Sequence, residues 1–263
     1  SFFWSLIITW IAQTSGKFFP TGNVTGEFVR IYLGIKKGLS PHEASSTVFA
    51  DLILATFSLF IIGLFSFFLV IFKDSSLIDS NYSHYIYISL ITIFFGCIFF
   101  YSIIKRRLLR HFIRKYNSIF NIKLDKKTIL FFIKLDISLY SLNKRKGSVL
   151  KALLFRLIGW LAGAFEIYVF LLIMDVHVSI VDVILIESFT GIIRAIAFFV
   201  PAGIGIQELA FVVIGNYVGL SPSVAFSVAL GRRVREFLVG IPAIVTWIIF
   251  FGKDLKVKKG LDK

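Results

Sequence analysis

The chain has 263 residues, of which 57% are hydrophobic, and it carries a formal net charge of +14. Soluble proteins of this length have shorter and more amphipathic stretches, whereas several runs here approach the ~20 apolar residues that cross a bilayer core. The composition therefore excludes a soluble globular protein and predicts an all-α polytopic membrane protein. The chain begins inside an apolar run and without methionine, so we expect its natural N-terminus to lie further upstream.

The first part of the chain holds two interrupted apolar pieces and then one long span. Residues 2–19 are apolar and end at Pro20, and the apolar piece that follows, 28–35, is too short to cross. Ser40–Pro41 predicts a helix start, because serine caps free N–H groups and proline suits the first helical turn. This helix runs to about residue 72, which is long enough to span with tilt.

A strongly basic segment separates the next two predicted spans, 85–104 and 152–174. Residues 105–151 carry fourteen Lys and Arg against two Asp. Two amphipathic pieces inside this segment, 108–120 and 129–142, are predicted to lie in the membrane interface. Nucleic-acid binding is a poor explanation for a basic segment that has a membrane span on each side. We therefore expect the segment to be cytoplasmic and to lie near anionic lipid headgroups.

The last part of the chain repeats the pattern of the first part. Residues 183–200 are apolar and end at Pro201, and the piece 209–218 is again too short to cross. Ser221–Pro222 then predicts a second long helix, which ends near residue 251. At an offset of 181 residues, 11 of the 29 positions from 18 to 46 are identical to their partners, which indicates an internal duplication.

The positive-inside rule orients these elements. With 105–151 in the cytoplasm, the span 42–72 runs outward. The basic C-terminal tail is also cytoplasmic, so 222–251 runs inward and the two copies of the repeated motif face opposite sides. Residues 183–218 must then enter and leave on one side as a re-entrant hairpin, and residues 1–36 form its inverted counterpart.

The predicted architecture is thus a single transmembrane domain over 1–263. It is an inverted repeat in which each half has a re-entrant hairpin followed by a long transmembrane helix. Repeat 1 covers about 1–72 and repeat 2 covers about 183–252. Residues 85–174 contain the connecting spans and the basic amphipathic segment.

The two breaks contain residues that suit a ligand site. After Pro201, Gly203 and Gly205 allow unusual dihedrals, and the restarting helix directs free N–H groups at the tip, where a phosphate or carboxylate can bind. Glu208 lies near this helix start, and Glu27 has the equivalent position in the first half. The alternative is that each break is only a hairpin turn whose acid is a structural cap.

Charged side chains inside membrane segments are costly and usually face a cavity or a partner. Glu187 and Arg194 are seven residues apart, on one helix face, and are a predicted pair. Arg232 and Glu236 are four apart and form a second predicted pair. Asp51 and Arg232 occupy equivalent positions in the two repeats, which predicts that they meet across the pseudo-twofold axis.

Two further observations on the polar residues limit the functions to consider. For Arg156 we favour snorkelling to the membrane interface, and for the cluster Arg232, Arg233 and Arg235 an interfacial or structural role is as good an interpretation as a functional one. The single cysteine and the four histidines show no metal-ligand spacing, and the sequence has no ATP-binding loop and no catalytic constellation. We therefore expect no metal, no cofactor and no enzymatic activity.

Two spaced motifs carry a resemblance to a known family. The first joins Pro20, Gly26, Glu27 and Arg30 to a G-L-S-P-x-x-A-x-x-x-V-x-x-D pattern that ends at Asp51. The second is P-A-G-I-G-I-Q-E at 201–208. Together they resemble the transmembrane domain of lysylphosphatidylglycerol synthases and their stand-alone flippase-like relatives, and the second motif is closest to the hopanoid-cluster members.

This resemblance has two departures and one omission. Ala202 stands where the family usually has glycine, and Gln207 precedes the acid. The 263 residues contain no soluble aminoacyl-transfer domain, so the resemblance does not imply the synthase activity of the bifunctional members.

The resemblance implies that a polar-headgroup lipid moves between the leaflets of a prokaryotic plasma membrane. Phosphate would bind helix N-termini and arginines, while the two acids of the motifs would bind a cationic headgroup or carry coupling protons. The residues expected to bind substrate are Glu27, Arg30, Arg194, Pro201, Gly203, Gly205 and Glu208, and those expected to provide cavity or coupling charges are Asp51, Glu187 and Arg232.

Two other functions fit the same sequence. One is a non-transporting scaffold or accessory subunit of lipid or envelope biosynthesis, which a closed space with Glu208 and Arg194 paired to each other would favour. The other is a proton-coupled carrier of a small solute, which a cavity sealed from the lipid would favour. The expected partners are membrane lipids, and the candidate protein partners are a second copy of the chain or a lipid-synthesis enzyme.

The predicted topology can be tested by cysteine labelling. In a variant with Cys97 replaced, we expect Ser40→Cys to react with a membrane-impermeant maleimide only from the cytoplasmic side and Ser221→Cys only from the external side, because the two repeat copies face opposite ways. Labelling of intact and of permeabilised cells measures this. Labelling of both positions from one side would contradict the inverted repeat.

Overall fold

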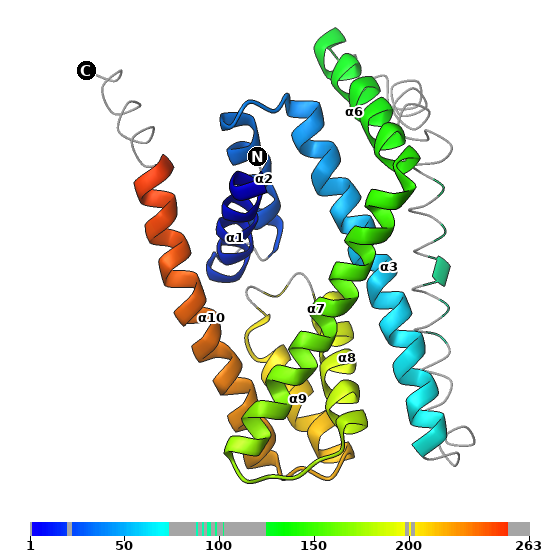
Figure 1. The fold of residues 1–263 in the computed structure, drawn as a ribbon, viewed down its shortest axis with the longest axis vertical. Helices are drawn as coiled ribbons and strands as arrows, with labels where there is room; N and C mark the ends of the chain where they lie inside the picture. The colour runs from blue at the N-terminus through cyan, green and yellow to red at the C-terminus, as the bar shows by residue number, and fades with distance from the viewer. Residues whose placement is uncertain are drawn as a thin grey trace. The chain divides into compact units, whose positions relative to one another are not determined.

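The computed structural model is helical throughout its regular secondary structure (Figure 1). It describes residues 2–19, 23–73, 125–197, 200 and 203–251, and the single residues 88, 91, 94, 95, 98 and 102. The helices are α1 (Phe2–Phe18), α2 (Asn23–Lys36), α3 (Pro41–Lys73), α6 (Lys126–Lys144), α7 (Lys146–Ile173), α8 (Ile180–Ile196), α9 (Ile206–Tyr217) and α10 (Pro222–Phe251).

Three of these helices, α3, α7 and α10, are long and apolar enough to cross a membrane. They correspond to the predicted spans 42–72, 152–174 and 222–251, which confirms the expectation of an all-α integral membrane protein. The fourth predicted span, 85–104, lies largely outside the described residues. Helix α6 contains the second predicted amphipathic piece, 129–142.

The helix boundaries repeat at the same offset as the sequence. Helix α2 ends 181 residues before α9 ends, at Lys36 and Tyr217, and α3 begins 181 residues before α10 begins. Between them, Gly38 and Gly219 have φ angles of 96° and 93°, which glycine adopts without strain. The duplicated G-L-S-P tetrapeptide therefore encodes a unit that ends one helix and starts the next.

Hydrogen bonds close the two copies of this unit in the same way. The N–H of Leu39 donates to the carbonyl of Gly34 at 3.1 Å, and the N–H of Leu220 donates to the carbonyl of Gly215 at 2.8 Å. Ser40 also forms the predicted cap of α3, because its backbone N–H donates to Glu43 Oε2 at 3.0 Å.

The chain divides into two compact units. Unit 1 consists of residues 1–39 and 193–263, and unit 2 consists of residues 40–192. Unit 1 therefore combines the first short helix pair of the chain, α1 and α2, with α9 and the last long helix, α10.

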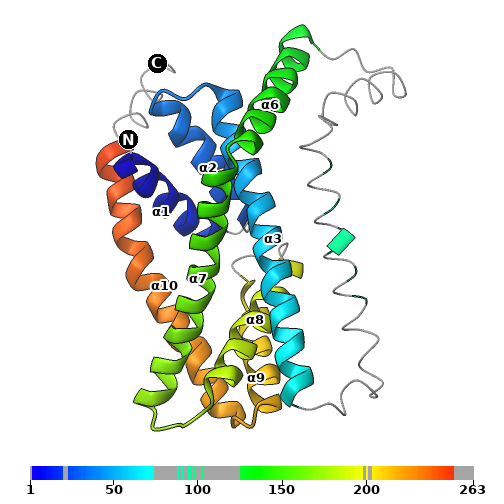
Figure 2. The ribbon, with the colours of Figure 1, turned by 45° about the vertical axis from the view of Figure 1, so that its right-hand side comes forward.

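Within unit 1, α1 runs antiparallel to the C-terminal half of α10 (Figure 2). The Trp4 ring lies 5.5 Å from the Phe250 ring, and the Phe18 ring lies 5.2 Å from the Phe237 ring, centroid to centroid. Between these ends, Trp10 Nε1 donates to the Val239 carbonyl at 3.1 Å. The C-terminal end of α1 thus reaches the middle of α10.

Helix α9 runs antiparallel to the other half of α10. A Cβ atom added to Gly215 would lie 2.7 Å from the Cβ of Ala225, near the start of α10. At the opposite end of α9, Glu208 bonds to Arg233, which is close to the middle of the 30-residue α10. The start of α9 and the end of α1 therefore approach the same part of α10.

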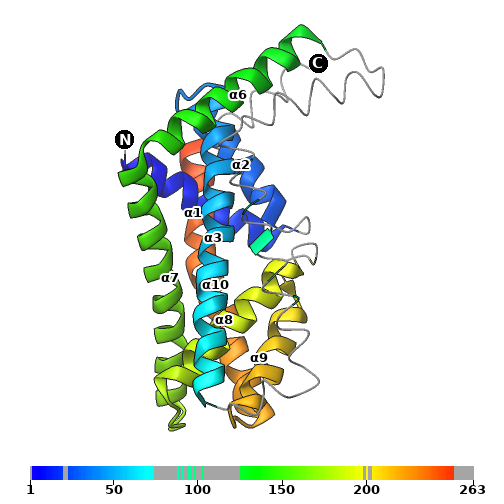
Figure 3. The same ribbon diagram turned by 90° about the vertical axis from the view of Figure 1, so that its right-hand side faces the viewer.

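In unit 2, α3 and α7 run alongside each other in the same direction (Figure 3). Asp51 of α3 pairs with Arg156 of α7, and one to two turns further along both helices Trp160 Nε1 donates to Ser58 Oγ at 3.4 Å. This agrees with the orientation predicted from charge, in which both spans run outward. Gly191 of α8 leaves no room for a Cβ atom beside the Trp160 ring.

Glycine permits close packing of α1 on α2. A Cβ atom added to Gly26 would lie 2.5 Å from the Ala12 carbonyl oxygen and 3.2 Å from the Gly16 Cα. Small residues at such crossings are typical of helix packing in membranes.

We expect Gly26→Ala to separate α1 from α2 and to lower the free energy of unfolding by about 1–3 kcal/mol, as overpacking does. Unfolding in mixed micelles measures this. Gly159→Ala is the control, since a Cβ atom there meets no atom within 4 Å and alanine favours the helix by about 1 kcal/mol. A Gly26→Ala variant as stable as Gly159→Ala would contradict the close packing.

Candidate functional site

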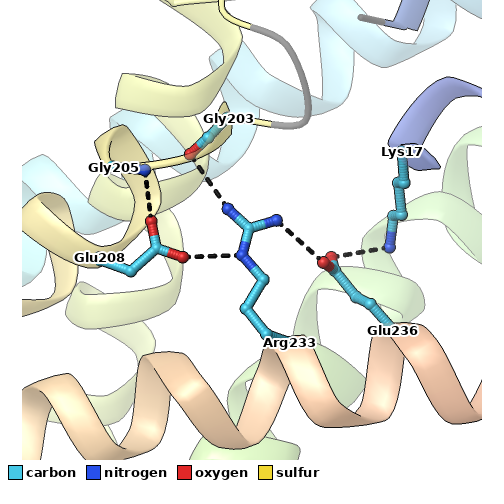
Figure 4. Close-up of polar contacts among 6 residues, drawn as sticks. All are labelled: Lys17, Gly203, Gly205, Glu208, Arg233 and Glu236. Carbon is cyan, nitrogen blue, oxygen red and sulfur yellow. Dashed lines mark hydrogen bonds and ion pairs between the residues drawn. The ribbon is translucent and has the colours of Figure 1, made fainter. Parts of the chain in front are cut away.

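A chain of ion pairs lies beside the middle of α10 in unit 1 (Figure 4). It joins four side chains, Lys17, Glu208, Arg233 and Glu236, and two backbone groups of the turn before α9. We call it the Arg233 network. It brings together residues from the two ends of the sequence.

Arg233 is the centre of the network. Its Nε donates to Glu208 Oε1 at 2.7 Å, its Nη1 donates to Glu236 Oε2 at 3.1 Å, and its Nη2 donates to the carbonyl of Gly203 at 3.1 Å. The rigid fork of donors on a guanidinium makes this three-way contact possible, which a lysine ammonium would not reproduce in the same plane.

Glu208 uses both carboxylate oxygens. Oε1 accepts from Arg233, and Oε2 accepts from the N–H of Gly205 at 2.8 Å, which caps the start of α9. The turn requires φ angles of 60° at Gly203 and 82° at Gly205, which explains the two glycines. We predicted an open site for a phosphate or carboxylate here, and this was wrong in one respect: the carboxylate of Glu208 itself occupies the helix start.

Glu236 connects the network to α1. Its Oε1 lies 2.9 Å from Lys17 Nζ, and Lys17 is in the last turn of α1, where a cation also interacts favourably with the helix dipole. The positive charge of Arg194 acts on both Lys17 and Glu236. The end of α1, the middle of α10 and the start of α9 are therefore linked by charge-assisted hydrogen bonds.

Most of the network is sheltered from solvent. The side chains of Glu208 and Arg233 are each 16% exposed and that of Glu236 is 8% exposed, whereas Lys17 is 34% exposed. Charges at this level of burial interact more strongly than a surface pair, and loss of one partner leaves the other uncompensated. In addition, the guanidinium and the backbone N–H both stabilise the charged form of Glu208, which disfavours a proton-carrying role for this acid in this arrangement.

The structure brings together some of the predicted substrate-binding residues. Gly203, Gly205 and Glu208 are in the network, and Arg194 acts on it electrostatically. Pro201 lies outside the described residues. Glu27 and Arg30 lie on α2, one turn apart, and both have polar or electrostatic partners.

The predicted cavity charges lie in both units. Asp51 pairs with Arg156 in unit 2, so Arg156 has a specific partner where we predicted only snorkelling. The buried Arg232 of unit 1 has its guanidinium 5.6 Å from the centre of the Phe211 ring. The predicted pairs of Asp51 with Arg232 and of Glu187 with Arg194 each join residues of different units, and they stay predictions.

Sequence reasoning missed two members of the network. We predicted Arg232 as the partner of Glu236, from an i,i+4 spacing, whereas the structure pairs Glu236 with Arg233, at i,i+3, and with Lys17. Lys17 had a usable signal, since it is the last charge before the first break. In the part of the chain that the structure describes, no three His, Cys, Asp or Glu side chains gather in a way that could hold a metal ion.

Comparison with known proteins identifies one family. The family model described as the lysylphosphatidylglycerol synthase TM region matches residues 1–243. No curated protein and no solved structure matches the chain.

Removal of the central arginine tests the energetic role of the network. We expect Arg233→Gln to lower the free energy of unfolding by about 2–4 kcal/mol, because Glu208 and Glu236 lose their shared counter-charge. Unfolding in mixed micelles measures the change. The matched control is Arg235→Gln, two residues away on the same helix and exposed, for which we expect about 0.5 kcal/mol or less. Equal stability of the two variants would show that the network does not hold the fold.

Proposed function

Because the chain belongs to the family of the lysylphosphatidylglycerol synthase transmembrane region, we propose that it moves a polar-headgroup lipid between the leaflets of the cytoplasmic membrane. The observation that carries this proposal is the Arg233 network. Charged groups in the middle of a membrane helix are costly, and they are retained where a polar substrate has to pass.

The lengths of the helices support re-entrant hairpins. Helices α2 and α9 have 14 and 12 residues, so each is roughly 20 Å long, well short of the ~30 Å of a bilayer core. The end of α1 and the start of α9 both approach the middle of α10. We therefore propose that α1 with α2, and α8 with α9, enter the membrane from opposite sides and that their tips meet near its midplane, as in an inverted repeat.

An aromatic and basic cluster supports the proposed orientation. Lys37 Nζ lies 3.4 Å from the centre of the Trp4 ring and 5.0 Å from that of the Phe251 ring, at the C-terminal end of α10. Tryptophan with lysine is typical of a membrane interface, and basic residues favour its cytoplasmic side. In this orientation the C-terminus and residues 105–151 are cytoplasmic.

The mechanism that we propose is an exchange of ion pairs. A phosphate of the headgroup binds the guanidinium of Arg233 in place of a carboxylate, since both groups accept two parallel hydrogen bonds. The released acid, Glu208 or Glu236, then faces any cationic part of the same headgroup. Because charges exchange partners and are not stripped bare, the headgroup passes the middle of the membrane at a reduced cost while the acyl tails stay in lipid.

A scaffold or accessory subunit of lipid biosynthesis is the second candidate. The observation that favours it is that Glu208 already has both oxygens engaged within the protein, by Arg233 and Gly205. A network that is satisfied internally holds helices together without any ligand. We expected Arg194 to be the partner of Glu208 in such a protein, and Arg233 has that position.

Lipid flipping by Glu208 variants tests the proposal. In vesicles of phosphatidylethanolamine and phosphatidylglycerol with a trace of fluorescent phosphatidylglycerol, we expect purified protein to expose the inner-leaflet probe to a membrane-impermeant quencher. Glu208→Gln should slow this exchange about tenfold, which corresponds to ~1.4 kcal/mol of barrier, because an uncharged amide binds Arg233 too weakly to exchange.

Arg235→Gln is again the control and should flip at the wild-type rate, while the thermal stability of every variant is measured in parallel. Unchanged flipping in a folded Glu208→Gln variant would remove this acid from the mechanism. Absence of flipping by the wild-type protein would favour the scaffold.

A further inference from the structure

The side-chain amide of Gln207 is buried with neither of its ends paired. Its relative exposure is 0%, and in the part of the chain that the structure describes neither Oε1 nor Nε2 has a hydrogen-bond partner. Buried polar groups are nearly always hydrogen-bonded, because an unpaired one has lost its water without compensation. An amide with both an unpaired acceptor and an unpaired donor is therefore a feature that needs an explanation.

The amide is directed toward the turn that contains the Arg233 network. Gln207 is the second residue of α9, and side chains of a helix lean toward its N-terminus, which here is the turn of Gly203 and Gly205. Gln207 also shares a helix face with Phe211, one turn later, whose ring packs against Arg232 of α10. The unpaired amide is thus the immediate neighbour of the Glu208 and Arg233 pair.

The charges around the amide limit what it can bind. A bare anion at this position meets the carboxylate of Glu208, which already caps α9. A bare cation meets the guanidinium groups of Arg232 and Arg233. An uncharged hydroxyl group avoids both repulsions, and it is at once a donor for Oε1 and an acceptor for Nε2.

We propose that Gln207 binds hydroxyl groups of the lipid headgroup, and that it selects polyol headgroups of the glycerol or sugar type over headgroups that end in a methylated ammonium. This inference rests on the proposed function and names the substrate class of that site. A methylated ammonium has no hydrogen-bond donor or acceptor, so its binding would leave the amide unpaired, and a polar site rejects ligands that lack the matching group. Gln207 would then determine specificity, while Arg233 binds the phosphate that both headgroup types share.

Binding of two short-chain lipids to the purified full chain in detergent tests the proposal. The probes are dihexanoyl phosphatidylglycerol and dihexanoyl phosphatidylcholine, which differ in the headgroup but not in the phosphate or the tails. We expect the wild type to bind the glycerol probe about tenfold more tightly, the ratio that two neutral hydrogen bonds supply. In Gln207→Leu the ratio should fall to about one, with no loss of thermal stability, because an unpaired amide is replaced by an apolar group.

The matched control is Gln13→Leu, an exposed glutamine of α1 in the same unit, which should keep the wild-type ratio. If Gln207→Leu does not fold, Gln207→Met supplies a side chain of similar length without the amide. Equal binding of both probes by the wild type, or an unchanged ratio in the Gln207 variant, would overturn the proposal. An unchanged ratio with lower thermal stability would do so as well, and would assign the amide to a structural water.

The failure of this inference can be told apart from failure of the proposed function. Selective binding in detergent without flipping in vesicles would support the role of Gln207 in recognition and contradict transport. Flipping without selectivity would support transport and contradict the role of Gln207.

Discussion

An arginine in the middle of a membrane helix keeps its charge, and every N–H of its guanidinium therefore has to find an acceptor. Arg233 imposes this constraint on the unit of the protein that contains it. Its acceptors are the Glu208 carboxylate, the Glu236 carboxylate and the Gly203 carbonyl, at 2.7–3.1 Å. The position of α9 follows from this requirement, because its first turn must present an acid and a carbonyl to the same face of α10. The glycines of that turn allow the backbone to do so.

The same network joins α1 to the rest of its unit through Glu236. Two acids and two bases share four side chains, so the formal charges of Lys17, Glu208, Arg233 and Glu236 cancel. A neutral set of this kind is tolerated where an isolated charge is not, because each member has a partner within hydrogen-bond distance. It also offers a visiting headgroup a partner of either sign. These two properties are why the network supports both the proposed transport and, if no lipid enters, a structural role.

The duplicated motif, the long spans and the helix boundaries could be predicted from the sequence, because each rests on local signals. A proline after an apolar run ends a helix, and Ser-Pro starts one, wherever the rest of the chain lies. The partners within the site were harder to predict. The spacing of Arg232 and Glu236 suited a pair within one helix, but Arg232 packs on Phe211, and it is Arg233 that faces both acids. Side-chain pairing across helices depends on their rotation about the long axis, which a stripe of lipid-facing apolar residues on all sides of α10 does not specify. Lys17 was missed because its partner is more than two hundred residues away in sequence.

Unit 1 is assembled from both ends of the chain, residues 1–39 and 193–263, and this has a consequence for biosynthesis. Helices α1 and α2 leave the ribosome first, but the helix that they pack on, α10, leaves last. Throughout the synthesis of the intervening residues Lys17 has to do without Glu236, and the glycine-lined pair α1 and α2 has only its own packing to hold it. The close fit of Gly26 against α1 then serves as a provisional fold that keeps the early hairpin intact until its partner arrives. Completion of the site is thus coupled to completion of the chain, and a polypeptide that stops before α10 cannot form the charged centre at all.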